Sequence, residues 1–319
     1  MNQHLSILPG RPITKSQASG WWSCCEKARL FLADPVLPRT ALANVEPTPY
    51  PLLRHRAVDT FQSSLHAQLV RSPQPLPEGV VDEMWAAAWR RSGADEPPDQ
   101  QTLEEVIRPY AADLPFFRGG RLLASQWTLG ASYLQRRWET RVDAILGAID
   151  GALEALEITG RQNAFGDVRA LTVNAAITQL CLRESPSLPI QLRQREHRVT
   201  VGSMARYTAA LRNSDATIET AVDITLPWEQ VEWTLQALDA FLVDVVASPD
   251  MYAPSPSIQL CAECRYGRAG ACQWGWVPNN GPTSDEFGRS GGAVLPRETA
   301  EVRMELMGEE PDSDDGRSA

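Results

Sequence analysis

Lysine is almost absent from this chain of 319 residues, in which Lys15 and Lys27 are the only two among 30 basic residues. The other 28 are arginines, a bias that high-GC coding alone can produce. Because no lysine follows Lys27, a catalytic motif in which a lysine stands two residues after an acid is excluded from the rest of the chain. Arginine can still hold phosphates through bidentate contacts wherever it clusters.

Long apolar segments are also missing. No run of about 18 apolar residues occurs, so the sequence predicts no membrane-spanning helix. Residues 1–17 lack the charged start and the apolar stretch of a secretory signal. We therefore expect a cytoplasmic protein without a membrane partner, in which thiols stay reduced. The net charge of −10 excludes attraction of nucleic acid by the overall charge of the molecule.

The pattern of apolar residues changes along the chain. Apolar residues at helical spacing predict helices at 16–33, 58–70 and 80–91, and several helices that fill 102–158. After Gly160, short apolar or alternating stretches predict strands within 167–183, 189–201 and 217–226, with helices at 203–213 and 228–246. The expected fold class is α/β (α+β), with a helical N-terminal half and a small central mixed sheet flanked by helices.

The same pattern suggests a division of the chain into three parts. Residues 1–13 are expected to form a flexible arm, and residues 14–277 a single domain in which 102–158 is a helical insertion. The remainder, 278–319, is rich in glycine, proline and acidic residues and predicts a flexible tail.

Six cysteines in a reducing compartment indicate metal ligands, catalytic groups or buried thiols rather than disulfides. Three of them share one short stretch rich in glycine and arginine, at Cys261, Cys264 and Cys272. A tetrahedral metal site needs a fourth ligand, which Cys24 or Cys25 can supply. Cys181 is the other candidate, but its apolar surroundings favour a buried core thiol. Soft thiolates favour zinc or an iron–sulfur cluster.

Two segments resemble the RecB-type PD-(D/E)XK nucleases that carry an iron–sulfur cluster. Residues 14–32 are similar to the opening of that family, with Cys24 at the first cluster ligand and Cys25 where proline is usual. Residues 254–266 are similar to its closing motif, and Cys272 stands for the last ligand after a slightly longer gap. AddB subunits of recombination complexes and RecB-like CRISPR-associated nucleases share this one-plus-three arrangement.

The resemblance implies a 4Fe–4S cluster, with zinc as the alternative. Its ligands are the thiolates of Cys24, Cys261, Cys264 and Cys272. Such a cluster would be a clasp that joins the N- and C-terminal regions of one nuclease-like domain.

The resemblance also indicates where hydrolytic groups should lie. Residues 61–66 are similar to the family's histidine motif, which ends at His66, and residues 147–151 to its Gly-x-x-Asp motif, with Asp150. An ordinary histidine and a solvated helix face are the alternative readings of these two. The acid-x-lysine expected on the next strand is missing, since 170–177 holds neither an acid nor a base. Hydrolysis by a divalent metal needs carboxylates to hold the ion, so we expect a catalytically inactive nuclease core.

Arginines and aromatic residues supply candidate nucleic acid contacts near the predicted sheet and on the cysteine loop, at Arg193, Arg195, Arg198, Arg206, Arg265, Arg268, Tyr266 and Trp274. Guanidinium groups grip phosphates and aromatic rings stack on bases. A salt-bridged surface is the alternative, because 40 acidic residues offer partners. A second group of arginines comprises Arg118, Arg121, Arg136, Arg137 and Arg141.

We therefore expect a metal-cluster-containing, nucleic-acid-binding structural subunit of a larger recombination, CRISPR or phage-defence complex. Its partners are DNA or RNA and other protein subunits. One alternative is an active DNA nuclease with relocated catalytic groups, which alone would need Mg²⁺. The other is a zinc-stabilised protein-interaction module without a nucleic acid partner.

Overall fold

The computed structural model of the protein describes residues 12–23, 50–74, 76–94, 96–117, 120–160 and 165–247. The chain divides into two compact units. The first contains 1–9, 17–45 and 236–319, of which only the ends of two helices are described. The second contains 10–16 and 46–235 and holds the whole sheet. None of the described helices is long and apolar enough to cross a membrane.

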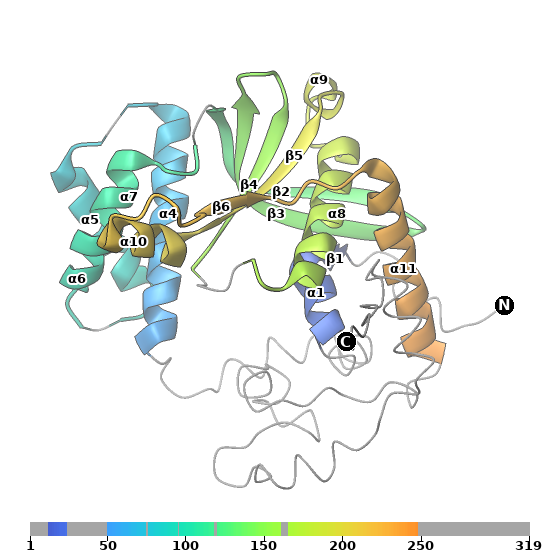
Figure 1. The fold of residues 1–319 in the computed structure, drawn as a ribbon, viewed down its shortest axis with the longest axis horizontal. Helices are drawn as coiled ribbons and strands as arrows, with labels where there is room; N and C mark the ends of the chain where they lie inside the picture. Colours follow the sequence, from blue (N-terminus) through green and yellow to red (C-terminus); the bar gives the residue numbers. More distant parts are fainter. Residues whose placement is uncertain are drawn as a thin grey trace, which may run out of the picture. The chain divides into compact units, whose positions relative to one another are not determined.

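Helices make up most of the described chain before Gly120. They are α1 (Lys15–Ser23), α4 (Tyr50–Arg71), α5 (Glu78–Arg91), α6 (Gln100–Thr102), the π-helical turn η3 (Leu103–Ile107) and α7 (Arg108–Asp113). The helices predicted at 58–70 and 80–91 are confirmed by α4 and α5, and α4 begins earlier than predicted. Figure 1 shows α4 to α7 gathered on one side of the sheet, with α8 on the other.

Two buried tryptophans fix the position of α5 against its neighbours. Trp85 and Trp89 lie on one face of the helix and are 0% and 1% exposed. Their indole N–H groups donate to the backbone oxygens of Asp99, at 3.3 Å, and Glu96, at 2.9 Å. Buried indoles need such partners, so the connection after α5 is tied to the helix and the core is closed at that end.

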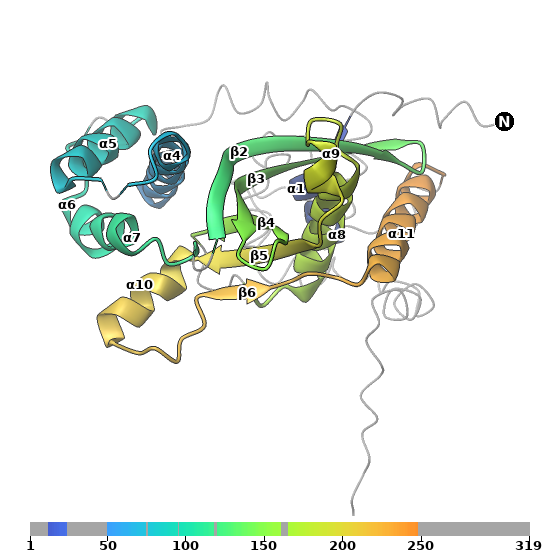
Figure 2. The same cartoon turned by 90° about the horizontal axis from the view of Figure 1, so that it is seen from above.

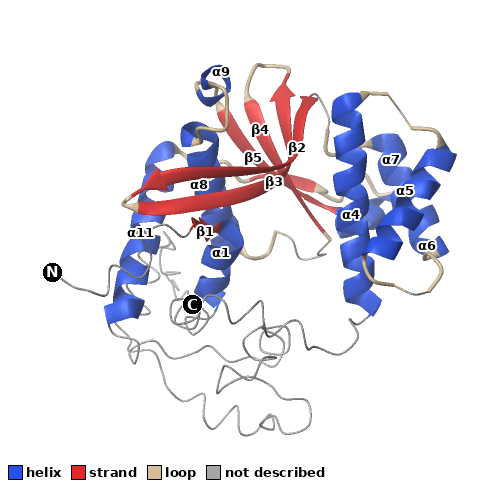
Figure 3. Ribbon diagram, turned by 180° about the vertical axis from the view of Figure 1, so that it is seen from behind, coloured by secondary structure: helices blue, strands red, loops and turns tan. Residues whose placement is uncertain are grey.

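The sheet has six strands in mixed orientation. They are β1 (Pro12–Thr14), β2 (Gly120–Tyr133), β3 (Arg136–Ala148), β4 (Leu153–Thr159), β5 (His197–Ser203) and β6 (Ala221–Asp223). The order is β1-β3-β4-β5-β6, with β2 on the other edge of β3. The pairs β1–β3 and β4–β5 are parallel, and the remaining pairs are antiparallel. The sheet between its two helical layers confirms the expected fold class (Figure 3).

The long strand β3 has two partners in line along one of its edges. The strand β1 pairs with Arg137 to Glu139, and β4 pairs with Ala144 to Gly147. Between them, residues 140–143 of β3 have no partner strand on that edge within the described part of the chain. This interruption of the sheet is where several polar side chains gather.

The predicted helical insertion at 102–158 is wrong from Gly120 onward, because β2, β3 and β4 occupy that stretch. Ala144, Ile145 and Leu146 are consecutive and all buried, because the centre of the sheet is covered on both faces. Such strands lose the alternation that marks a half-exposed strand. Ile149, which the helical pattern placed in the core, is 89% exposed in a turn.

The strand predicted within 167–183 is also wrong, since this segment forms the helix α8 (Val168–Glu184). The Asp167 side chain caps it by accepting from the backbone N–H of Ala170. Residues 175–182 are buried without interruption, so the helix is apolar around most of its circumference. A buried helix of this kind shows no amphipathic period, and its sequence looks like a buried strand.

The later elements follow the sequence more closely. The short helix α9 (Ile190–Arg193) was not predicted, but β5 and β6 confirm strands in the two segments after it. The helices α10 (Met204–Asn213) and α11 (Trp228–Ala247) confirm the predictions at 203–213 and 228–246. Ser203 caps α10 by accepting from the backbone N–H of Arg206.

Candidate functional site

His66 lies on α4 with no exposed surface, on the helix where the resemblance placed a histidine. Its Nε2 is 2.9 Å from the Tyr110 hydroxyl, and the Phe117 ring packs edge-on against it at 4.9 Å. Burial lowers the pKa of His66 to about 4, although the nearby Asp143 opposes this shift. The imidazole is therefore neutral at pH 7.

The Nδ1 atom of the same ring has no hydrogen-bond partner among the described residues. The backbone of Asp143 also favours the protonated form of the ring. One turn earlier on α4, Gln62 is 4% exposed and its Nε2 is likewise buried without a described partner. This face of α4 therefore directs two polar groups at the sheet.

Asp143 of β3, which sequence reasoning missed, is the acid that acts on His66. Its Oδ1 accepts from Gln126 Nε2 at 3.1 Å, and its Oδ2 accepts from the backbone N–H of Ile158 at 2.7 Å. The carboxylate thus ties β2 and β4 to β3 beside the interruption of the sheet. An acid between two apolar residues, the buried Val142 and Ala144, could have indicated this site. It was missed because the segment was interpreted as a helix.

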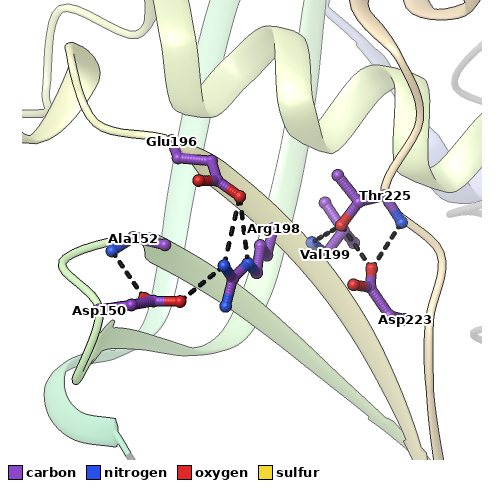
Figure 4. Close-up of polar contacts among 7 residues, drawn as sticks. All are labelled: Asp150, Ala152, Glu196, Arg198, Val199, Asp223 and Thr225. Atoms are coloured by element: carbon purple, nitrogen blue, oxygen red, sulfur yellow. Dashed lines mark hydrogen bonds and ion pairs between the residues drawn. The ribbon is translucent and has the colours of Figure 1, made fainter.

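Asp150 occupies a different part of the molecule from His66. It lies in the turn between β3 and β4, where Oδ1 accepts from the backbone N–H of Ala152 at 3.1 Å and Oδ2 pairs with Arg198 at 2.6 Å (Figure 4). These two partners lower its pKa. At about 3.3 Å per strand residue, it lies roughly 20 Å along the chain from Asp143. The structure therefore does not bring the two sequence-predicted catalytic candidates together.

The strand that follows β3 is β4, rather than the predicted 170–177, and it carries Glu157. This side chain forms an ion pair with Lys15, which enters directly after β1. Thr178 of α8 donates to the same carboxylate at 3.2 Å, and its oxygen lies 3.2 Å from the Thr140 hydroxyl. Lys15 and Glu157 are 13% and 12% exposed. A lysine from the other end of the domain thus contacts an acid on the strand where acid-x-lysine was expected.

These residues do not fit a divalent metal of the kind the resemblance implies. No three His, Cys, Asp or Glu side chains are placed to hold an ion in the part of the chain that the structure describes. Asp143 is bound to Gln126 and a backbone amide, while Glu157 is bound to Lys15 and α8. Hard cations prefer several oxygen ligands converging on one point, and these two carboxylates have separate partners.

Two of the predicted arginine contacts are engaged with the protein. Arg198 joins Asp150 and Glu196 across neighbouring strands, as Figure 4 shows. Arg206 donates to the backbone oxygen of Glu219 at 3.0 Å, and its guanidinium carbon lies 4.7 Å from the centre of the Phe165 ring.

The other two arginines lie at the end of α9. Arg193 is its last residue and has a buried Nε without a described partner, whereas Arg195 is exposed. No contact joins these four arginines to one another among the described residues. A single arginine surface in this region stays a prediction.

The proposed cluster ligands lie outside the described residues, as do the other contacts predicted on the cysteine loop. These are Cys24, Cys261, Cys264, Cys272, Arg265, Arg268, Tyr266 and Trp274. Cys181 is described, has no exposed surface and lies 3.8 Å from the backbone oxygen of Trp138. Burial raises the pKa of its thiol to about 12, so it is a core residue as predicted.

No protein-family model matches the chain, and no curated protein matches it either. A crystal structure of a Eubacterium rectale protein provisionally named an exonuclease is similar, with a TM-score of 0.43 and 11% identity over 91% of this chain and 96% of that one. A crystal structure of SSO0001 is similar with a TM-score of 0.31 and 10% identity, over 76% of this chain and 97% of that one.

Proposed function

We propose that this protein is a structural subunit that binds nucleic acid through a nuclease-like domain without cleaving it. One observation carries the proposal. His66 lies on an early helix next to an acid of the following sheet, as the resemblance implies, but the acid is held in internal hydrogen bonds. The order of elements, a helix with His66 followed by β2, β3, β4 and α8, agrees with that resemblance.

The chemistry of Asp143 supports the loss of hydrolysis. A carboxylate that holds a catalytic metal must offer lone pairs to the ion and be joined by further anionic ligands. The two oxygens of Asp143 accept from Gln126 and from the backbone N–H of Ile158, so both already have partners within the protein. Nucleic acid binding needs none of these groups, because phosphate contacts come from arginines on the surface.

A digestion assay tests this proposal. Purified protein with Mg²⁺ or Mn²⁺ should leave labelled single- and double-stranded DNA and RNA intact, while a filter-binding assay detects complexes. Asp143→Asn and His66→Ala are the matched variants. Cleavage by the wild type that either variant abolishes contradicts the proposal, and cleavage that neither variant changes indicates a contaminating nuclease or an unrelated site.

The active nuclease with relocated groups remains the second candidate, and the Lys15–Glu157 pair is the observation that favours it. The sequence contains no acid-x-lysine motif on this strand, but the fold places a lysine beside its carboxylate. In that case, metal-dependent cleavage should disappear in both Lys15→Met and Glu157→Gln. Under our proposal these two variants change stability only.

The cluster and the complex are further parts of the proposal. Four thiolates from Cys24 and the loop 261–272 would hold a 4Fe–4S cluster or zinc, and the domain would act beside other subunits. Spacing of the cysteines and the resemblance support this assignment. Affinity purification from the native host, with bound proteins and nucleic acid identified together, tests membership in a complex.

A further inference from the structure

The long hairpin of β2 and β3 has one face turned to the core. Leu129 and Ala131 of β2 and Trp138, Thr140 and Val142 of β3 are at most 5% exposed. Thr178 and Cys181 of α8 and Ser185, which follows it, contact Thr140, the backbone oxygen of Trp138 and the backbone N–H of Gly130. Figure 2 shows α8 on one side of the hairpin. Because side chains alternate along a strand, the other residues of the hairpin point away from α8.

That opposite face is polar and carries two exposed arginines. The register pairs Ser132 with Arg137, Gly130 with Glu139 and Thr128 with Arg141. The β2 members of these pairs are Ser132, Gly130 and Thr128, which add little bulk beside the two guanidinium groups. Within the described part of the chain, neither Arg137 nor Arg141 has a hydrogen bond or an ion pair.

The same face continues toward the exposed part of α4. Burial raises the pKa of the Asp59 carboxyl, and the charges of His55 and Arg141 oppose that rise, so Arg141 lies within electrostatic range of α4. Asp59 is 3.5 Å from His55, and Arg54 beside it is exposed. Basic side chains therefore occur both on the hairpin and in the first turns of α4, with the carboxyl group of Asp59 within electrostatic range of both.

We infer that this face, defined by Arg137 and Arg141 over Thr128, Gly130 and Ser132, binds the phosphate backbone of single-stranded nucleic acid. The inference rests on the proposed function and says where the strand lies. Unpaired guanidinium groups complement phosphates in charge and geometry. Arg137 and Arg141 are about 13 Å apart along β3 at about 3.3 Å per residue, so the two guanidinium groups can contact two separate phosphates of one strand. The small β2 residues let the backbone approach closely.

Binding of a fluorescent 30-nucleotide single strand to the full chain across a salt series tests the inference. Each phosphate contact to a single strand adds about 0.7 to the slope of log K against log salt. We expect Arg137→Gln with Arg141→Gln to reduce the slope by about 1.4 and the affinity at 0.1 M salt by about 25-fold. The matched control is Arg90→Gln with Arg91→Gln at the exposed end of α5, which changes the charge equally and should leave both values unchanged.

A gain of binding separates a contact surface from a folding defect. Glu139→Gln removes the carboxylate between the two arginines and should raise the affinity, by up to about fivefold at 0.1 M salt if one unit of charge is gained. Wild-type binding with an unchanged slope in the hairpin variant overturns the inference and leaves the proposed function intact. No wild-type binding to any single strand overturns both. If the α5 control loses as much affinity and slope as the hairpin variant, the effect comes from overall charge, and this result also overturns the inference.

Discussion

At the scale of single residues, the site is defined by which polar atoms already have partners. One ring nitrogen of His66 lies within hydrogen-bond distance of Tyr110, and the other has no partner among the residues that the structure describes. The two carboxylate oxygens of Asp143 accept hydrogen bonds from Gln126 of β2 and Ile158 of β4. A buried group that is neutral at pH 7 contributes to stability in a manner that depends on pH, and this makes His66 a sensitive probe of the site.

We predict that His66 makes the protein lose stability as the pH falls. Its pKa is about 4 when folded and 6.5 when unfolded, so below pH 6.5 the unfolded chain takes up a proton that the folded chain refuses. The loss grows until about pH 4 and amounts to about 3 kcal/mol. Urea unfolding of wild type and His66→Gln between pH 7 and 4 measures it as a difference.

The difference between the two proteins is the informative quantity. Asp59, whose pKa is raised, and His197, whose pKa is lowered by burial, titrate in both proteins and cancel. If the two pH profiles run parallel, His66 is not buried as a neutral ring and the geometry of the site is wrong.

At the scale of elements, one close contact between the sheet and the aromatic ring of Phe116 requires a glycine. The position of Gly202 on β5 is such a contact: a Cβ atom there would lie 2.9 Å from the Phe116 ring. Phe116 is 6% exposed and packs with Tyr110 and Tyr207. The ring cannot move aside without disturbing the aromatic cluster between the sheet and α7.

We therefore predict that Gly202→Ala destabilises the protein by about 1–3 kcal/mol, as overpacking of a core does. The matched control is Gly130→Ala on the hairpin, where a new Cβ would meet only the backbone oxygen of Trp138 at 3.6 Å. Thermal and urea unfolding of both variants measure the difference. Equal stability of the two variants would mean that β5 and α7 are farther apart than described.

The Lys15–Glu157 pair joins the first residue of α1 to β4, and it is largely buried. Removing one partner leaves the other charge uncompensated, which costs about 3–5 kcal/mol. We predict that Lys15→Met and Glu157→Gln are each strongly destabilising and that the double variant is less destabilised than their sum. A double-mutant cycle by urea unfolding measures this coupling, and additive single effects contradict the pair.

At the scale of the whole molecule, the proposed metal cluster would link residues far apart in the sequence. Cys24 and Cys261 are separated by more than 200 residues. Binding of the metal would therefore close a very large loop, and its binding free energy would add to the free energy of folding. The described domain, with its buried tryptophans and covered sheet, has a core of its own. The cluster would therefore act on the assembly of the chain ends rather than on the sheet.

We predict that Cys264→Ser lowers bound iron, sulfide or zinc and makes the full chain sensitive to proteases or insoluble. Anaerobic purification with metal analysis, followed by limited proteolysis, measures both effects. Cys25→Ser is the control that separates the two candidate first ligands, and it should keep the metal if Cys24 is the ligand. A wild-type protein that is folded, soluble and free of metal contradicts the cluster.

The sequence by itself determined the elements whose periodicity survives burial. In α4, α5, α10 and α11 one face meets solvent, so apolar residues recur at helical spacing and caps such as Ser203 mark an end. Cys181 was predicted as a core residue because its neighbours are apolar.

Only the tertiary structure decided the identity of β2 to β4 and α8, and with them the site. The centre of β3 at Ala144 to Leu146 is covered on both faces, and α8 is buried around most of its circumference, so both lose their periods and were predicted as the wrong element. The roles of Asp143 and Lys15 were not predicted, because an ion pair or a hydrogen bond between distant segments leaves no local pattern in the chain. Register and chain crossing, which packing of the whole core sets, bring Lys15 to Glu157 and turn Arg137 and Arg141 away from α8.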